Sequence, residues 1–306
     1  MHPINGTADV YLIPGDPVLN VRAPRLFNAV FERFGIDAVL VPARVMARDL
    51  AVFLRGSFLA TNVKGMVIAP PHKPLVGALL DGCGLFGRVA GSVNAVRRAE
   101  GGGLEGDLFD GEGLVGALDH YGIPFRGKRA LILGAGVSGA AIGVALAQGG
   151  TVNGAEHIAF HDPVAGKAIG LATQLDAFFD ATVTAAASSD PAGYDLVVNA
   201  SRLGLEPDDA LACDVSRMDA HAALFDIVLR GQPTPLVRAA RARGLHAQAG
   251  FEMLIQQIPE YLDYFGHAEA AEGVRADADF LRELIYPASM AGEIRAPLRY
   301  RSASVA

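Results

Sequence analysis

Residues 129–147, RALILGAGVSGAAIGVALA, decide the fold class of this 306-residue chain. The apolar run 131–133 is typical of a buried strand, and the alanine-rich stretch after the glycines is typical of a helix. Between them, residues 134–139 match Gly-x-Gly-x-x-Gly. The first glycine permits a tight turn, the second lets backbone amides approach a pyrophosphate, and the third allows close helix–strand packing. The amides at the helix start also stabilise an anion. The segment predicts a dinucleotide-binding Rossmann unit, with a purely structural turn as the alternative. The predicted coenzyme-binding residues of the loop are Gly134, Ala135, Gly136, Val137, Ser138 and Gly139.

The acidic residue that ends the next predicted strand indicates which coenzyme binds. Asp162 closes IAFHD, further from the first glycine than the usual ~20 residues, because residues 149–157 lengthen the connection. A carboxylate there accepts hydrogen bonds from a ribose 2′-hydroxyl and repels a 2′-phosphate. We therefore expect NAD in preference to NADP, with Lys167 and Arg202 as basic residues that would weaken the preference. The alternative is that Asp162 only caps the following helix.

Strand-like and helical segments alternate on both sides of this motif, which predicts an α/β protein with mainly parallel pairing. The glycine-rich stretch 100–106 predicts a mobile loop or a hairpin tip. The predicted strands lie near 10–15, 38–41, 65–68, 129–133, 157–162, 195–201 and 224–229. The predicted helices lie near 24–34, 45–53, 137–148, 235–244, 253–265 and 276–284.

Composition excludes several classes of protein. Apolar residue types make up 51% of the chain and charged types 19%, so the chain can bury a core. The net charge of −7 argues against a nucleic-acid partner. Residues 130–148 are uncharged, but their glycines fit a strand, turn and helix better than a membrane span. Two cysteines and eight histidines show no metal-ligand spacing, and no secretory segment is visible. We expect a cytoplasmic protein with a small-molecule substrate and no metal.

Eight segments in order resemble the shikimate/quinate dehydrogenase family, over nearly all of residues 9–265. They are GDPVLNVRAPRLFNAVF (15–31), GMVIAPPHK (65–73), GSVNAV (91–96), GDLFDGEG (106–113), GAGVSG (134–139), DLVVNAS (195–201), TPLVRAARARG (234–244) and GFEMLIQQ (250–257). The resemblance implies an N-terminal α/β substrate-binding domain (1–118 with 251–290), a Rossmann domain (119–250) and a C-terminal tail (291–306).

The resemblance also implies roles for single residues. Lys73 would exchange the hydroxyl proton while a hydride leaves the same carbon, and Asp110 would orient the lysine. Asn94 and Gln257 would hydrogen-bond substrate hydroxyls. Without the resemblance, these four would be read as loop, turn and surface residues. Further contacts to the coenzyme would come from Ala200, Ser201, Arg202, Ile227 and Gly250.

The first family motif departs from its usual pattern. The resemblance implies two serines that hold a carboxylate, but this chain has Val21 and Ala23, with Arg22 between them. Each lost hydrogen bond to a charge costs about 1–3 kcal/mol. The Asn-Val-Thr of the second motif is here residues 67–69, Val-Ile-Ala, and the His-Asn of the first motif is Phe27-Asn28. Arg22 could supply a bidentate carboxylate contact instead, or point into solvent.

The sequence therefore predicts an NAD-dependent oxidoreductase acting on a hydroxylated, cyclic small molecule other than shikimate, or on shikimate bound differently. One alternative is a true shikimate or quinate dehydrogenase with rearranged carboxylate contacts. Another is a catalytically silent NAD-binding sensor, against which the retention of Lys73 and Asp110 argues. The oligomeric state is left open, with a homodimer among the options.

Overall fold

The computed structural model describes residues 4–206, 208–295 and 300, and the chain divides into two compact units. Unit 1 comprises Met1–Phe109 and Gln257–Ile285, and unit 2 comprises Asp110–Gln256 and Tyr286–Ala306. The first division falls at the start of helix α5 (Asp110–Tyr121), and the second falls within helix α10 (Phe251–Tyr264). The prediction placed the domain limits at 118, 250 and 290, whereas the units divide after 109, 256 and 285.

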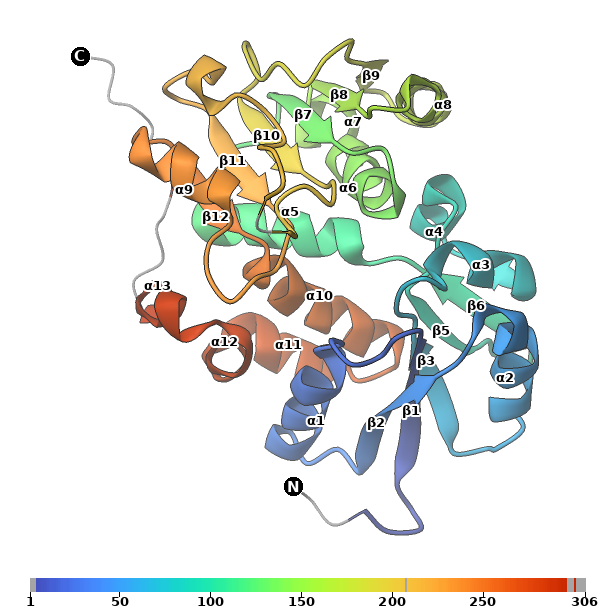
Figure 1. The fold of residues 1–306 in the computed structure, drawn as a ribbon. Helices are drawn as coiled ribbons and strands as arrows, with labels where there is room; N and C mark the ends of the chain where they lie inside the picture. The colour runs from blue at the N-terminus through green and yellow to red at the C-terminus, as the bar shows by residue number, and fades with distance from the viewer. Residues whose placement is uncertain (1–3, 207, 296–299, 301–306) are drawn as a thin grey trace. The chain divides into compact units, whose positions relative to one another are not determined.

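Unit 1 is built on a six-stranded mixed sheet with the order β2-β1-β3-β5-β6-β4 (Figure 1). Strand β5 runs antiparallel to both of its neighbours, and the other pairs are parallel. The strands β5 and β6 form a hairpin over the glycine-rich stretch, so the predicted hairpin tip is confirmed. The strands are β1 (Asp9–Gly15), β2 (Ala38–Arg44), β3 (Val63–Val67), β4 (Gly82–Cys83), β5 (Ala95–Arg98) and β6 (Leu104–Asp107).

The helices of unit 1 bury apolar faces against this sheet and against one another. Helix α1 buries Leu26, Phe27, Val30 and Phe31 at helical spacing. A second cluster joins α2 to the strands, including Leu54, Met66 and Val96. The helices are α1 (Ala23–Arg33), α2 (Leu50–Ser57), α3 (Lys73–Val76), α4 (Leu85–Ala90), α11 (Ala268–Ala276), α12 (Asp279–Ile285) and the second part of α10, with 3-10 turns η1 (Ala47–Asp49) and η2 (Gly77–Leu79).

The outer strand β2 has a protected edge. The Asn28 side chain accepts a hydrogen bond from the Leu40 amide (2.8 Å) and donates one to the Leu40 carbonyl (3.1 Å). The amide group thus takes the place of a neighbouring strand, and Pro42 two residues on has no N–H to offer. Asn28 is therefore a structural residue of unit 1.

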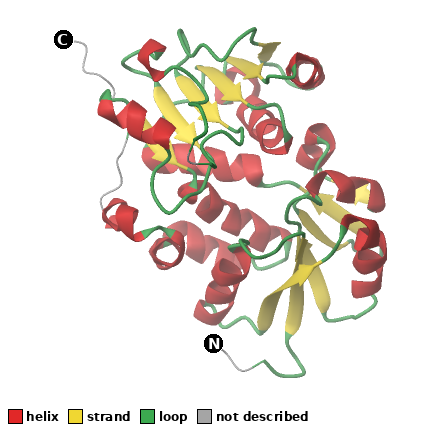
Figure 2. Cartoon of the chain, viewed as in Figure 1, coloured by secondary structure: helices red, strands yellow, loops and turns green. Residues whose placement is uncertain are grey.

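Unit 2 carries the predicted Rossmann fold, an all-parallel six-stranded sheet with the order β12-β11-β10-β7-β8-β9. Figure 2 draws its strands in yellow and the helices that accompany them in red. Ala159 packs in a cluster with residues of α9, whereas the adjacent Phe160 contacts Gly143 of α6, so these helices cover opposite faces. The strands are β7 (Arg129–Leu133), β8 (His157–His161), β9 (Thr182–Ala185), β10 (Leu196–Asn199), β11 (Ala223–Asp226) and β12 (His246–Ala249). The helices are α5, α6 (Val137–Ala147), α7 (Gly150–Asn153), α8 (Ala165–Asp176), α9 (Pro235–Ala242), α13 (Ala291–Arg295) and the first part of α10, with 3-10 turns η3 (Val215–Arg217) and η4 (Ala288–Met290).

Helix α5 is missing from the sequence-based prediction because its sequence, DGEGLVGALDHY, is rich in glycine. Those glycines serve close packing. A Cβ on Gly111 would lie 2.2 Å from the carbonyl oxygen of Ala141 in α6. The helices α5 and α6 therefore pack with their backbones nearly in contact, which a larger side chain would prevent.

Two further predictions concern the membrane and the C-terminal tail. Within the described residues, no helix is long and apolar enough to cross a bilayer. Most of the predicted tail lies outside the described residues, except α13 and Tyr300. The hydroxyl of Tyr300 donates to the His221 carbonyl (2.8 Å), so this part of the tail packs on unit 2.

Candidate functional site

The glycine loop after β7 has the geometry that the motif predicts. Gly134 has a φ of +109°, which only glycine adopts readily, and this makes the tight turn. A Cβ on Gly139 would lie 2.0 Å from the Gly134 carbonyl oxygen, so the third glycine allows the helix to pack close. Gly136 has open space where a Cβ would stand. That opening leaves the first amides of α6 accessible to an anion such as a pyrophosphate.

Asp162 is a brace of this loop. One carboxylate oxygen accepts from the Ala135 amide (3.0 Å), and the other accepts from the Val164 amide (2.9 Å). Helix α8 begins after Val164, so the second of these hydrogen bonds holds the residue at the start of the helix, and Asp162 braces both the glycine loop and the approach to α8. Its charge is already committed to two backbone donors of unit 2.

Two of the other predicted coenzyme residues pack next to the loop, and two more pack on each other further along the carboxyl edge of the sheet. A Cβ on Gly134 would lie 2.9 Å from the backbone of Ala200 and Ser201. In the same way, a Cβ on Gly250 would lie 2.8 Å from the Ile227 Cα. The ends of β7, β10, β11 and β12 thus form one continuous backbone surface within unit 2.

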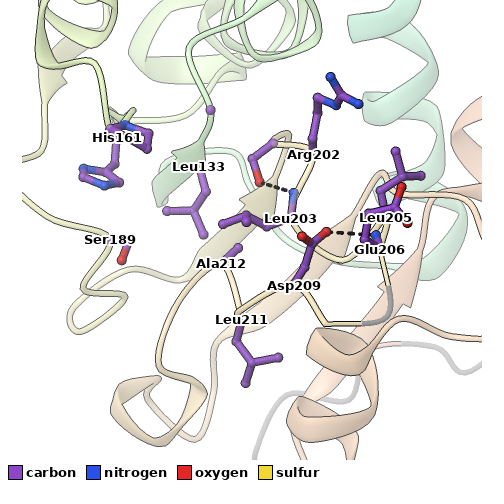
Figure 3. A pocket seen from close by; sticks show the side chains of 13 residues that line it. Leu133, His161, Ser189, Arg202, Leu203, Leu205, Glu206, Asp209, Leu211 and Ala212 are labelled. Carbon is purple, nitrogen blue, oxygen red and sulfur yellow. Dashed lines mark hydrogen bonds between the residues drawn. The ribbon is translucent and has the colours of Figure 1, made fainter.

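A pocket of about 580 Å³ opens beside this surface (Figure 3). Arg202 and Leu205 from the loop after β10 form one part of the wall, and His161 and Ser189 form another (Figure 3). Asp209 holds the wall loop by accepting from the Gly204 amide (3.0 Å) and the Glu206 amide (2.9 Å). The full lining is Leu133, Gly134, His161, Pro163, Ser189, Ser201, Arg202, Leu203, Leu205, Glu206, Asp209, Leu211 and Ala212. Its size and mixed lining suit part of a dinucleotide.

Two buried polar residues that the sequence reasoning did not single out brace the loops of this pocket. Asn199 and Asp226 end β10 and β11, are register partners, and are both fully buried. The Asn199 amide donates to Asp226 (2.9 Å) and accepts from the Ser201 amide (3.1 Å) and hydroxyl (2.6 Å). Burial raises the pKa of Asp226 to about 6. A polar residue directly after an apolar strand, as in LVVN and ALFD, is the sequence signal for this pair.

In unit 1, the backbone brings Lys73 and Asn94 close together. The Val93 amide donates to the Lys73 carbonyl (2.9 Å), and the Ile68 amide donates to the Asn94 carbonyl (2.7 Å). Lys73 begins α3 and is partly buried. The Asn94 side chain is fully buried, and its Oδ1 accepts from the Phe109 amide (3.1 Å). Its Nδ2 has no hydrogen-bond partner among the described residues, so a donor is held at this point without an acceptor.

Gln257 lies on α10, which contacts the same part of unit 1. Its Nε2 is also buried, and the described part of the chain offers it no hydrogen-bond partner. One turn along the helix, the hydroxyl of Tyr261 donates to the Asn94 carbonyl (3.5 Å), and its ring packs on Phe109 and Phe27. Buried polar groups in native proteins nearly always have partners. Two orphaned amide donors in one region of unit 1 indicate a ligand that offers hydrogen-bond acceptors.

The remaining predicted site residues lie as follows. Asp110 begins α5 in unit 2 and is buried, so it belongs to the other unit from Lys73, and their joint role stays a prediction. Arg22 lies at the N-cap of α1 and is half-buried, and burial lowers the pKa of its guanidinium. Val21 and Ala23, beside it, are partly buried. The Arg22 side chain makes no capping hydrogen bond to α1.

Known proteins resemble the chain in sequence and in fold. Residues 13–96 match the family of the shikimate dehydrogenase substrate binding domain. The chain is 33% identical to the shikimate dehydrogenase (NADP(+)) of Rubrobacter xylanophilus over 83% of this chain and 89% of that protein. It is 32% identical to the shikimate dehydrogenase (NADP(+)) of Acidiphilium cryptum over 86% and 92%. Among solved structures, the 5-ketofructose reductase of a Gluconobacter species is 26% identical with a TM-score of 0.78, covering 90% of this chain and all of that one.

These relatives correct the prediction about the coenzyme. The preference for NAD over NADP rested on Asp162, but the relatives are named as NADP(+) enzymes, and the prediction is wrong. The structure supplies the physical reason. Both oxygens of the Asp162 carboxylate accept backbone hydrogen bonds inside unit 2, so the residue has a structural role that the sequence pattern did not reveal.

Proposed function

The chain belongs to the shikimate/quinate dehydrogenase family, and on that premise we propose that it is an NADP-dependent oxidoreductase that interconverts a hydroxyl and a carbonyl group on a small hydroxylated ring. The observation that carries the proposal is the glycine loop, which opens at Gly136 beside a pocket of about 580 Å³. A bound nicotinamide coenzyme supplies the acceptor or donor of the hydride.

Arg202 is the residue of this pocket best suited to the third phosphate of NADP. It brings a guanidinium to the pocket wall, and its side chain is exposed. A guanidinium binds phosphate through two parallel hydrogen bonds. We assign to Arg202 the discrimination of NADP from NAD, while Asp162 serves the loop itself.

Lys73 handles the proton in this proposal. Oxidation of an alcohol requires a group that takes the hydroxyl proton while the hydride leaves, and reduction requires the same group to return it. Lys73 is partly buried, and its backbone is tied to the segment that carries Asn94. Asp110 orients the ammonium group. Asn94 Nδ2 and Gln257 Nε2 donate to oxygen atoms of the substrate, which satisfies two buried groups that the described residues leave unpaired.

The substrate of this chain binds without the carboxylate contacts that the family motif implies. The Val21 and Ala23 side chains offer no donor where that motif has hydroxyl groups, and Val67 and Ala69, which replace polar residues of the second motif, are apolar and buried. The name of the similar 5-ketofructose reductase describes a substrate without a carboxylate. We therefore propose an uncharged hydroxylated ring compound or ketose as the substrate class.

A second candidate is an ordinary shikimate or quinate dehydrogenase with rearranged contacts. The names of the curated relatives favour it, and Arg22 is the residue that would bind the carboxylate. A half-buried guanidinium could replace two hydroxyl donors by a bidentate contact.

An assay of purified protein separates the two candidates. The absorbance of reduced nicotinamide is followed with NADP or NAD against shikimate, quinate, 5-ketofructose and uncharged cyclic polyols. Turnover of the uncharged compounds, with shikimate kcat/KM below about 10⁴ M⁻¹s⁻¹, supports the proposed substrate class. Efficient turnover of shikimate or quinate that Arg22→Ala abolishes would establish the second candidate instead. Coenzyme binding with no turnover of any compound would contradict both.

A further inference from the structure

The two loops that carry the predicted coenzyme contacts are joined by one buried network in unit 2. The Asp226 carboxylate accepts from Asn199 Nδ2 (2.9 Å), the Val228 amide (3.1 Å) and the Thr234 hydroxyl (2.6 Å). Thr234 in turn accepts from the Val237 amide and caps α9. The loop from β11 to α9, residues 227–234, is therefore fixed at both ends by a single carboxylate.

On the other side, Asn199 fixes the loop that lines the pocket. Its Oδ1 accepts twice from Ser201, and its Nδ2 donates to the Leu203 carbonyl (3.0 Å) as well as to Asp226. The Ser201 hydroxyl accepts from the Leu203 amide (3.1 Å). The turn that presents Arg202 to the pocket is thus held on both sides by Asn199.

A second connection runs between the loops outside this network. The Arg230 guanidinium donates to the Gly204 carbonyl (3.2 Å). The residues at each end of the joined surface pack against glycines, Ala200 against Gly134 and Ile227 against Gly250. A shift of Asp226 would therefore move both loops relative to the glycine turn.

From this arrangement we infer that Asn199 and Asp226 act as one pair of positioning residues, which set the spacing of the two coenzyme-binding loops and so determine coenzyme affinity. The inference rests on the proposed function, because it assumes that these loops bind the coenzyme. Neither residue touches the coenzyme, since both side chains are fully buried. Their effect passes through the backbone of 200–205 and 227–234.

The test is a double-mutant cycle on the affinity for NADPH. The variants are Asn199→Leu, Asp226→Leu and both together, with the dissociation constant measured from the fluorescence of bound NADPH and the melting temperature measured in parallel. Each single variant is expected to raise the dissociation constant at least about tenfold. The double variant is expected to raise it no further than the more severe single variant does, because the effects of mutating residues that act as a unit are not additive.

Asp195→Asn is the matched control. Asp195 is a partly buried carboxylate that also accepts a backbone amide, that of Arg129 (2.9 Å), but it precedes β10, at the opposite end of the strand from the pocket. The variant is expected to lower the melting temperature with the NADPH affinity unchanged. If Asn199→Leu and Asp226→Leu behave like this control, their role is structural only, and the inference is overturned. It is also overturned if the two effects multiply in the double variant.

Thr234 keeps the inference testable if the leucine variants do not fold. Thr234→Ser retains the hydroxyl that donates to Asp226 and is expected to keep the NADPH affinity, whereas Thr234→Val is expected to weaken it several-fold, with an increase in coenzyme KM and little change in substrate KM. Equal affinities for the two variants would contradict the inference. Failure of the wild-type protein to bind NADPH would refute the proposed function and the inference together. NADPH binding without turnover would refute only the proposed reaction, because the affinities alone decide the inference.

Discussion

The loops of the coenzyme pocket satisfy their buried polar groups, whereas, in the part of the chain that the structure describes, the surroundings of Asn94 leave two of theirs unsatisfied. In unit 2, Asn199, Asp226 and Thr234 form hydrogen bonds with one another and with loop backbone. In unit 1, the side-chain nitrogens of Asn94 and Gln257 are buried without partners among the described residues. The first arrangement is complete in the free protein and costs no reorganisation when a ligand binds. The second leaves a penalty that a ligand with acceptor oxygens would remove.

This contrast suggests a division of roles, with coenzyme binding in the preorganised loops of unit 2 and substrate recognition around the unpaired amides of unit 1. A preorganised coenzyme cradle does not depend on the substrate, whereas a substrate region with orphaned donors depends on the groups that a particular substrate offers. The replacements at 21, 23, 67 and 69 all lie in unit 1, which is where the contrast predicts that specificity changes.

The largest effect is expected for Lys73→Ala. Loss of the proton-transfer group should lower kcat by about 10²–10⁴-fold, with the NADPH dissociation constant unchanged, because the cradle lies in unit 2. Stopped-flow turnover and NADPH fluorescence measure the two quantities. Lys64→Ala, an exposed lysine of unit 1, is the control and should leave both unchanged. Retention of more than a tenth of kcat by Lys73→Ala would remove the lysine from the mechanism.

Gly136→Ala should damage coenzyme binding while the fold stays intact. A methyl group there meets no described protein atom within 4 Å, so the melting temperature should stay near the wild-type value. The same methyl group would stand where the pyrophosphate approaches, and an affinity loss of about tenfold, or 1.4 kcal/mol, is expected by calorimetry. Gly170→Ala in α8, also in open space, should keep full affinity. Unchanged affinity in Gly136→Ala would place the pyrophosphate elsewhere.

Gln257→Leu and Thr234→Val should change stability in opposite directions. Removing the orphaned amide of Gln257 takes away a penalty of about 1–3 kcal/mol, so the free protein should become more stable while substrate KM rises. Removing the Thr234 hydroxyl leaves the buried Asp226 short of a donor and should destabilise by a similar amount. Urea unfolding of both variants compares them directly. Destabilisation by Gln257→Leu would mean that its amide is satisfied in the free protein.

The smallest effect is a pH dependence of stability. The pKa of Asp226 is raised to about 6 by burial, so the folded protein holds this proton more tightly than the unfolded chain does. The unfolded state releases the proton first as the pH rises, and stability from this group is lost between about pH 4 and pH 6. Relative to Asp226→Asn, the free energy of unfolding of the wild-type protein should fall by about 1 kcal/mol between about pH 5 and pH 7. A constant difference in unfolding free energy between the two proteins would show that Asp226 does not titrate in this range.

The sequence predicted the elements whose signal is local. Gly134, Gly136 and Gly139 have the three roles that their spacing indicates, because each role depends on the absence of a Cβ within a single turn. The apolar runs that became β7, β8, β10 and β11 were recognisable because buried parallel strands are apolar throughout. The helix at 110–121 was not, since its glycines look like turn residues until α6 is packed against them.

By itself, the sequence determined the Rossmann unit, the order of the family motifs and the amides of Asn94 and Gln257 as candidates for substrate contacts. Only the tertiary structure decided what the polar residues at the strand ends do. Asp162 is a brace of the glycine loop, and Asn199 and Asp226 form a buried pair, because each carboxylate or amide takes the nearest backbone donors that folding places around it. Hydrogen bonds between residues far apart in the chain leave no periodic pattern or fixed spacing in the sequence. Their partners can therefore be identified only once the folded structure is known.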